Sequence, residues 1–173
     1  MARNIEIKAR VADMDALTAR TAAIADSGPV EIPQDDTFFG CDNGRLKLRV
    51  HQHGRGELIF YRRPDGDGPK LSFYVLSPTD SPDTLREALT LANGQEGRVV
   101  KHRSVFMVGR TRVHLDRVQG LGDYMELEVV LADDESADDG VREAHALMAR
   151  LEIASDSLVT GAYHDLLRAR TVT

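Results

Sequence analysis

The chain has 173 residues with 22 basic and 28 acidic side chains, and its net charge of -6 argues against general nucleic-acid binding, which needs a basic domain. Its apolar content of 42% is typical of a globular domain, and no run approaches the ~18 apolar residues of a membrane helix. The single cysteine, Cys41, excludes an internal disulfide. We therefore expect one domain over residues 1–173 with no membrane or nucleic-acid partner. The lone cysteine and the lack of an apolar leader favour the cytoplasm.

Strands dominate the predicted elements of the first half of the chain. A strand begins near Asn4, and a short amphipathic helix over residues 11–26 follows, with Asp13 as its N-cap and a stop at residues 27–29. Glycine- and proline-rich turns, among them residues 64–69, separate the later segments and indicate hairpins. The further strands predicted in this half cover residues 34–39, 45–51, 58–63 and 70–76.

The second half opens with a helix and closes with two. Pro82 lies at the first position of a helix that ends at the Asn93-Gly94 pair. Strands are predicted over residues 99–108, 111–118 and 124–131. Residues 134–151 and 155–170 are predicted to be helices packed on the outside of the sheet.

Charged residues recur on a single face of these strands. Glu6 and Lys8 alternate with Ile5 and Ile7, so that charges and apolar groups point to opposite faces. The same alternation is present in the other strands, at Arg45, Lys47 and Arg49, at Lys101 and Arg103, at Arg112, His114 and Asp116, and at Glu126 and Glu128. Such a face can lie in water on the outside or line a lumen, and alternation alone leaves both open.

About eight antiparallel strands with charges on one face favour closure into a barrel with a polar lumen. We therefore predict an α+β, β-dominated fold in which an eight-stranded antiparallel barrel carries helices outside. Buried cations are costly unless they are compensated, and a polyanionic ligand with metal ions would compensate them. The carboxylates of Glu6, Asp116, Glu126 and Glu128 are hard oxygen ligands suited to Mg²⁺ or Mn²⁺.

Four sequence segments resemble motifs of one known family. Residues 4–8 (NIEIK) are similar to its E-x-E-x-K motif, and residues 46–49 (LKLR) to its phosphate-binding strand. Residues 115–128 (LDRVQGLGDYMELE) follow L-D-x-V-x-x-L-G-x-F-x-E-x-E almost throughout, and residues 162–167 (AYHDLL) are similar to its closing S-Y-x-D-L-L. On these segments the chain resembles the CYTH superfamily, the triphosphate tunnel metalloenzymes.

The resemblance implies a tunnel that binds a triphosphate on a basic wall and Mg²⁺ or Mn²⁺ on an acidic wall. It assigns substrate binding to Arg45, Lys47, Arg49, Arg62, Lys70, Lys101 and Arg103, metal binding to Asn4, Glu6, Glu126 and Glu128, and catalysis to Lys8, Arg112 and Asp116. We expect truncation of Arg49 or Arg103 to leave the ligand-free protein equally or more stable, because clustered cations repel one another.

Two departures from the motifs bear on function. Asn4 replaces the first glutamate, so one metal-binding carboxylate is missing, and the terminal lysine of thiamine triphosphatases is absent. The chain is thus most similar to the class IV adenylyl cyclase-like branch, which converts ATP to cyclic AMP and pyrophosphate. A triphosphate hydrolase and a non-catalytic polyphosphate- or nucleotide-binding module remain the alternatives, and the sequence also leaves open whether the protein is a homodimer.

Overall fold

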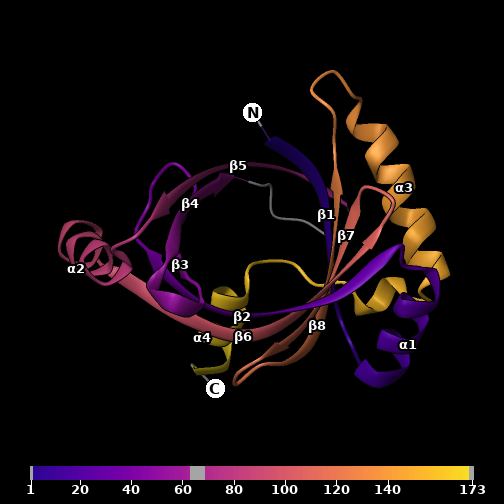
Figure 1. The fold of residues 1–173 in the computed structure, drawn as a ribbon, viewed down its shortest axis with the longest axis horizontal. Helices are drawn as coiled ribbons and strands as arrows, with labels where there is room; N and C mark the ends of the chain where they lie inside the picture. The colour runs from indigo at the N-terminus through magenta and orange to yellow at the C-terminus, as the bar shows by residue number, and fades with distance from the viewer. Residues whose placement is uncertain (1, 63–68, 172–173) are drawn as a thin grey trace.

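The computed structural model describes residues 2–62 and 69–171, in which eight antiparallel strands close into a barrel (Figure 1). Around the barrel the strand order is β1-β5-β4-β3-β2-β6-β7-β8. The predicted fold class is therefore confirmed. The strands are β1 Ala2–Arg10, β2 Ser27–Phe39, β3 Arg45–Val50, β4 Gly56–Arg62, β5 Lys70–Thr79, β6 Gln95–Val108, β7 Thr111–Val118 and β8 Gly122–Val130.

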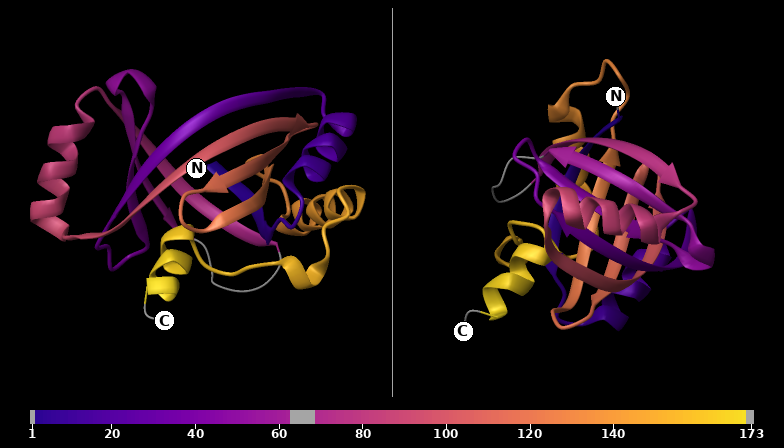
Figure 2. Two further views of the ribbon diagram at one scale, coloured as in Figure 1. Left: turned by 90° about the horizontal axis from the view of Figure 1, so that it is seen from below. Right: turned by 90° about the vertical axis from the view of Figure 1, so that its left-hand side faces the viewer.

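The helices lie around and at one end of this barrel (Figure 2). They are α1 Met14–Ile24, α2 Pro82–Asn93, α3 Ala137–Arg150 and α4 Tyr163–Thr171, with short 3₁₀ turns at Gln52–Gly54 and Ser155–Ser157. Asp13 caps α1 as predicted, since its carboxylate accepts from the backbone N–H of Ala16 at 2.9 Å. Among the described residues, no helix has both the length and the apolarity needed to cross a bilayer.

The strand β2 is longer than predicted and begins at Ser27 rather than at Gln34. Its first half pairs with β6, whereas its pairing with β3 covers only Asp35 to Phe39. One side of the first half thus has no β3 partner, and a strand edge tolerates prolines such as Pro33. The prolines made this segment resemble a turn in the sequence. Of the turn predicted over 64–69, all but the last residue lies outside the described residues.

The final predicted helix is divided in the structure. Residues 155–170 form a 3₁₀ turn, an extended stretch and then α4, because Gly161 has a φ of +82° that a continuing helix cannot adopt. The carboxylate of Asp165 accepts from the backbone N–H of Ala162 at 2.9 Å and caps the new helix. The chain therefore turns at residue 161 and enters one end of the barrel, rather than packing outside it.

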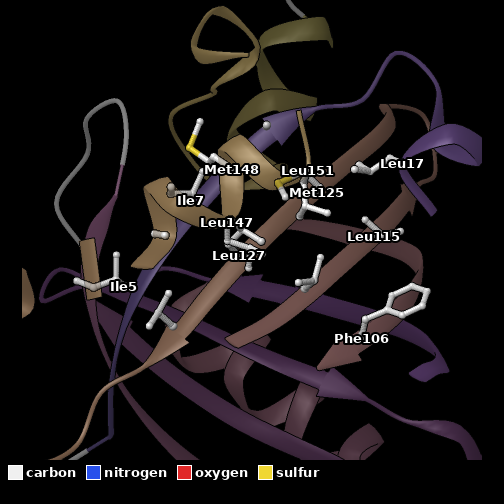
Figure 3. Close-up of a cluster of buried hydrophobic side chains, with 14 of the residues drawn as sticks. Ile5, Ile7, Leu17, Phe106, Leu115, Met125, Leu127, Leu147, Met148 and Leu151 are labelled. Atoms are coloured by element: carbon white, nitrogen blue, oxygen red, sulfur yellow. The ribbon is translucent and has the colours of Figure 1, made fainter. Parts of the chain in front are cut away.

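The main hydrophobic core lies outside the barrel, between the strands and the helices (Figure 3). Ile5 and Ile7 of β1 and Leu127 of β8 point outward and meet Leu147 of α3. The helix approaches closely at Gly140, where an added Cβ would lie 2.7 Å from Cγ1 of Ile5. Because the apolar face of the strands is used on the outside, the charged face lines the inside. The lumen interpretation of the alternating charges is therefore the correct one.

Candidate active site

The inward faces of all eight strands enclose a cavity of about 330 Å³. Its size falls within the range of small-ligand sites. Ala162 and Tyr163, at the start of α4, also line it and close one end of the tunnel. Tyr163 packs there in a second apolar cluster with Phe38 and Val99. The site is thus a charged tunnel with one end blocked by the C-terminal segment.

One wall of the tunnel is acidic and is built by β1 and β8. These strands are antiparallel neighbours, and their register places Glu6 opposite Glu128 and Lys8 opposite Glu126. Glu126 binds Nζ of Lys8 at 3.0 Å and a guanidinium nitrogen of Arg103 at 2.9 Å. Burial alone would raise the pKa of Glu126, but these two cations hold it well below its usual range. The carboxylate is therefore ionised at neutral pH.

Glu128 lies on the same wall and is as buried as Glu126, but its arginine partner is more accessible. Its Oε2 accepts from Nε of Arg112 at 2.9 Å. Burial would raise its pKa, whereas His114 and Arg112 lower it below the usual value. The Arg112 side chain is 36% exposed. Glu128 thus keeps its charge beside the more accessible Arg112, with a further contribution from the buried Arg103.

Two buried polar atoms on this side of the tunnel have no hydrogen-bond partner among the described residues, Oδ1 of Asn4 and Nδ1 of His114. Both residues line the cavity. His114 also forms a group with Glu126 and Glu128 in which one possible ligand atom from each lies within 4.8 Å of the others. Buried polar atoms are normally satisfied, so these groups fit a site that holds a hard divalent ion.

The opposite wall is basic and is organised by a buried aspartate of β2. Asp36 accepts two hydrogen bonds of 2.8 Å from Arg49 and one of 2.8 Å from Lys47. Burial would raise the pKa of Asp36, but Arg49 and Lys47 hold it well below its usual range. Burial and the neighbouring Arg49 lower the pKa of Lys47 to about 8. One carboxylate therefore fixes two cations, both of which line the cavity.

A second buried aspartate anchors the cations of β6. Asp116 accepts from Arg103 at 2.7 and 2.6 Å, from Lys101 at 3.3 Å and from the hydroxyl of Tyr163 at 2.7 Å. Its side chain is fully buried beneath them. Burial and the adjacent Arg103 lower the pKa of Lys101 to about 8. This arrangement indicates that Asp116 orients Arg103 and Lys101, rather than reaching the ligand itself.

Lys8 lies where the acidic wall meets the blocked end. Besides its ion pair with Glu126, its ammonium donates to the carbonyl of Gly161 at 3.2 Å and lies 4.0 Å from the ring centre of Tyr163. Lys101 approaches the same ring at 4.7 Å. The C-terminal tyrosine thus contacts two of the cations that the sequence assigned to the site.

Three of the residues predicted to bind substrate do not line the cavity. Arg45 points inward but binds Asp165 at 2.5 Å, and so holds α4. Lys70 is buried and shares the face of Ser72, a lining residue, without lining the cavity itself. Arg62 was expected in the tunnel and is not there.

The misplacement of Arg62 has a simple cause in the two-residue period of strand β4. The inward positions of this strand are Glu57, Ile59 and Tyr61. Arg62 therefore points outward, where it is exposed and lies over the rings of Phe60 and Phe73. The remaining predicted site residues line the tunnel, with Asp116 buried directly behind its wall.

Sequence reasoning assigned no role to His114, Asp36 or Tyr163. His114 alternates with Arg112 and Asp116 on β7, so the strand period alone indicated that it faces the lumen. Asp36 lies on β2 opposite Arg49 in register, which only the pairing reveals. Tyr163 comes from a helix start, and no strand periodicity could place it in the tunnel.

The fold and the site define a closed antiparallel tunnel with one acidic and one basic wall. Residues 2–163 match the CYTH domain family, and the chain belongs to this family, as the sequence motifs predicted. Adenylate cyclase CyaB of Aeromonas hydrophila is 27% identical over 170 residues, which cover 94% of this chain and 87% of that protein.

Solved structures share the fold at lower identity. The PH1012 protein of Pyrococcus horikoshii is 19% identical with a TM-score of 0.85, over 95% of this chain and 99% of that one. A putative adenylyl cyclase of Hippeastrum, described as having a dominant triphosphatase activity, is 16% identical with a TM-score of 0.69, over 96% of each chain.

Proposed function

We propose that this protein is a divalent-metal-dependent enzyme that acts on a triphosphate inside the tunnel, converting ATP to cyclic AMP and pyrophosphate. The observation that carries the proposal is the pair of oppositely charged walls facing one cavity with a blocked end. Similarity to the Aeromonas hydrophila adenylate cyclase supports the cyclase reaction.

The basic wall would hold the phosphate oxygens. The guanidinium groups of Arg49 and Arg103 are already oriented by bidentate contacts to Asp36 and Asp116, so little side-chain freedom remains to be lost on binding. Lys47 and Lys101 add compact charges beside them. Phosphoryl and nucleotidyl transfer depend mainly on such positioning and charge neutralisation.

The acidic wall would hold the metal, with Glu6, Glu126 and Glu128 as charged ligands and Asn4 as a neutral one. A bound Mg²⁺ or Mn²⁺ supplies charge neutralisation at the phosphate oxygens. In the cyclase reaction the ribose 3′-oxygen attacks the α-phosphorus, the bond from that phosphorus to the bridging oxygen breaks, and pyrophosphate leaves. Lys8 and Arg112 flank the acidic wall and would contact the charge that develops there.

A triphosphate hydrolase is the second candidate, and the triphosphatase activity ascribed to the Hippeastrum relative favours it. In that reaction water attacks the terminal phosphorus, the bond from that phosphorus to the bridging oxygen breaks, and the diphosphate leaves while the attacked phosphorus becomes orthophosphate. The two reactions use the same walls and differ in which phosphorus faces the nucleophile.

Product analysis tests the proposal. Purified protein is incubated with ATP, tripolyphosphate or thiamine triphosphate, each with Mg²⁺, with Mn²⁺ or with a chelator, and followed by ³¹P NMR. Cyclic AMP with pyrophosphate, dependent on metal, is the expected result. Orthophosphate would show a hydrolase instead, and tight binding without products would show a binding module.

The two lysines with lowered pKa predict how triphosphate binding depends on pH. Lys47 and Lys101 have pKa values of about 8, and an anion favours the charged form, so binding raises these values. Affinity for tripolyphosphate should therefore be highest below about pH 8 and fall above it, with protons taken up on binding near pH 8 to about 9. Calorimetry without metal, in buffers of different ionisation enthalpy, measures both effects.

A lysine-to-arginine exchange serves as the control for this prediction. Lys47→Arg keeps a charge that does not titrate in this range, so it should remove part of the pH dependence. Equal affinity at about pH 7 and about pH 9.5 in the wild type would contradict the assignment of these lysines to the phosphate site.

A further inference from the structure

We propose that His114 is a metal ligand and that its imidazole makes the site prefer a first-row transition-metal ion, such as Mn²⁺ or Co²⁺, over Mg²⁺. The inference rests on the proposed function for the presence of a divalent ion in the tunnel. It adds a nitrogen ligand to the proposed metal site and names the class of ion that the site prefers.

The strand register places the imidazole against the two glutamates. His114 of β7 is 5% exposed, is paired with Glu126 of β8 and faces the lumen. Its Nδ1 lies 3.8 Å from Oε2 of Glu126 and 3.7 Å from Oε1 of Glu128. Ligand bonds of about 2.1 Å place two ligands of one ion no more than about 4.2 Å apart. Both distances already meet this limit.

The remaining carboxylate oxygens already have partners in the wall. Oε1 of Glu126 binds Lys8, and Oε2 of Glu128 binds Arg112. Oε2 of Glu126, the oxygen nearest His114, also accepts from Arg103 at 2.9 Å, which uses one of its two lone pairs, whereas Oε1 of Glu128 faces His114. The wall therefore presents a nitrogen and two oxygens to a common point.

The unsatisfied Nδ1 indicates that His114 is a metal ligand rather than an ion-pair partner of the two glutamates. A side chain that only paired with the glutamates would approach one of them to hydrogen-bond distance, which is about 2.7–2.9 Å for charge-assisted contacts. The observed 3.7 and 3.8 Å are too long for hydrogen bonds, and Nδ1 has no other partner among the described residues. A buried ring nitrogen that lies near two carboxylates without bonding either fits a ligand of an ion held between them.

The mixture of donor atoms sets the preference among ions. Mg²⁺ favours near-octahedral oxygen coordination and keeps several waters, whereas imidazole nitrogen favours first-row transition metals. Asn4, which lines the same cavity with an unpartnered Oδ1, offers oxygen without charge and does not strengthen the hold on Mg²⁺. We therefore expect Mn²⁺ to bind more tightly than Mg²⁺.

Pulsed EPR on Mn²⁺ bound to the full-length protein without substrate tests the ligand directly. A coordinated imidazole gives ¹⁴N modulation, which should change when the protein carries ¹⁵N-histidine. All six histidines of the chain are among the described residues, and only His114 lines the cavity. The labelling experiment on the wild type therefore decides the question even if a variant fails to fold.

A variant of His114 and a matched control variant provide a second test of the ligand. His114→Gln should remove the ¹⁴N modulation and weaken Mn²⁺ binding by at least about tenfold, while Mg²⁺ binding changes less. His102→Gln alters an exposed histidine on the outer face of β6, which contacts Glu31, and should change neither quantity. Competition between Mg²⁺ and Mn²⁺, followed by the EPR signal of free Mn²⁺, measures the ratio.

The outcomes separate this inference from the proposed function. Bound Mn²⁺ without nitrogen modulation, modulation that persists in His114→Gln, or no Mn²⁺ binding would each overturn the role of His114. Metal-dependent turnover alongside such a result would leave the proposed function standing. Nitrogen-coupled Mn²⁺ without turnover of any triphosphate would support the ligand and overturn the enzyme.

Discussion

Glu128→Gln should reduce metal-dependent turnover by more than about a hundredfold, because we propose that Glu128 is a metal ligand, and such a charged ligand contributes several kcal/mol in the transition state. Of the two glutamates of β8, Glu128 is the better probe. Glu126 contacts the buried Lys8 and Arg103, so its loss would remove a carboxylate contact from each of two buried cations, whereas Glu128 is paired with the more accessible Arg112.

Steady-state rates at several metal concentrations, together with a thermal melt, test this prediction. Glu31→Gln is the matched control, since Glu31 lies on the outer face of β2 with His102 and Ser104. It should leave turnover unchanged. Full activity of Glu128→Gln with an unaltered metal midpoint would remove Glu128 from the metal site.

Arg103→Ala should lower the free energy of unfolding by about 3–5 kcal/mol. The arginine bridges Asp116 and Glu126, and all three side chains are largely buried, so truncation removes the main cation of Asp116 and one of the two cations that contact Glu126. The comparison variant is Arg98→Ala on the same strand. Arg98 also makes a bidentate contact with an aspartate, Asp35, but its side chain is 54% exposed, and such surface pairs contribute about 0–1 kcal/mol.

Chemical denaturation of both variants measures the difference. A ligand-free Arg103→Ala protein as stable as the wild type would mean that the basic wall is not held by its aspartates. This expectation reverses the one drawn from sequence, in which removing Arg49 or Arg103 relieved repulsion. Each arginine is paired with a buried aspartate, Asp36 or Asp116, so attraction outweighs repulsion in the ligand-free tunnel.

The period of two along the strands made most of the tunnel predictable. The period placed Glu6, Lys47 and Glu128 on the charged face of their strands, the strand count and the family resemblance assigned that face to the lumen, and the structure places them there. Arg62 was assigned by the resemblance alone, and the period of β4 places it on the outer face. Strand β4 carries apolar residues on both faces, such as Ile59 inside and Phe60 outside, so its sequence does not show which face points into the lumen.

Contacts between distant segments were not predictable in the same way. The pairing of Asp36 with Arg49 depends on the β2–β3 register, and the contact of Tyr163 with Asp116 depends on where the chain turns at Gly161. Neither leaves a local pattern. These contacts nevertheless determine whether the cations of the site are held in place before a ligand arrives.

The measurement that tests the tunnel most directly is calorimetry of tripolyphosphate binding. It compares the wild type with two variants, one that loses a cation inside the barrel and one that loses a cation outside it. Lys47→Met removes a lumen cation, yet Asp36 keeps both contacts to Arg49, so the fold should persist. Arg98→Met removes an exterior cation. We predict that Lys47→Met weakens binding by at least about tenfold, which corresponds to a charged contact of about 1.5–3 kcal/mol, and that Arg98→Met binds as the wild type does. Equal affinity in all three proteins would contradict a triphosphate site inside the tunnel.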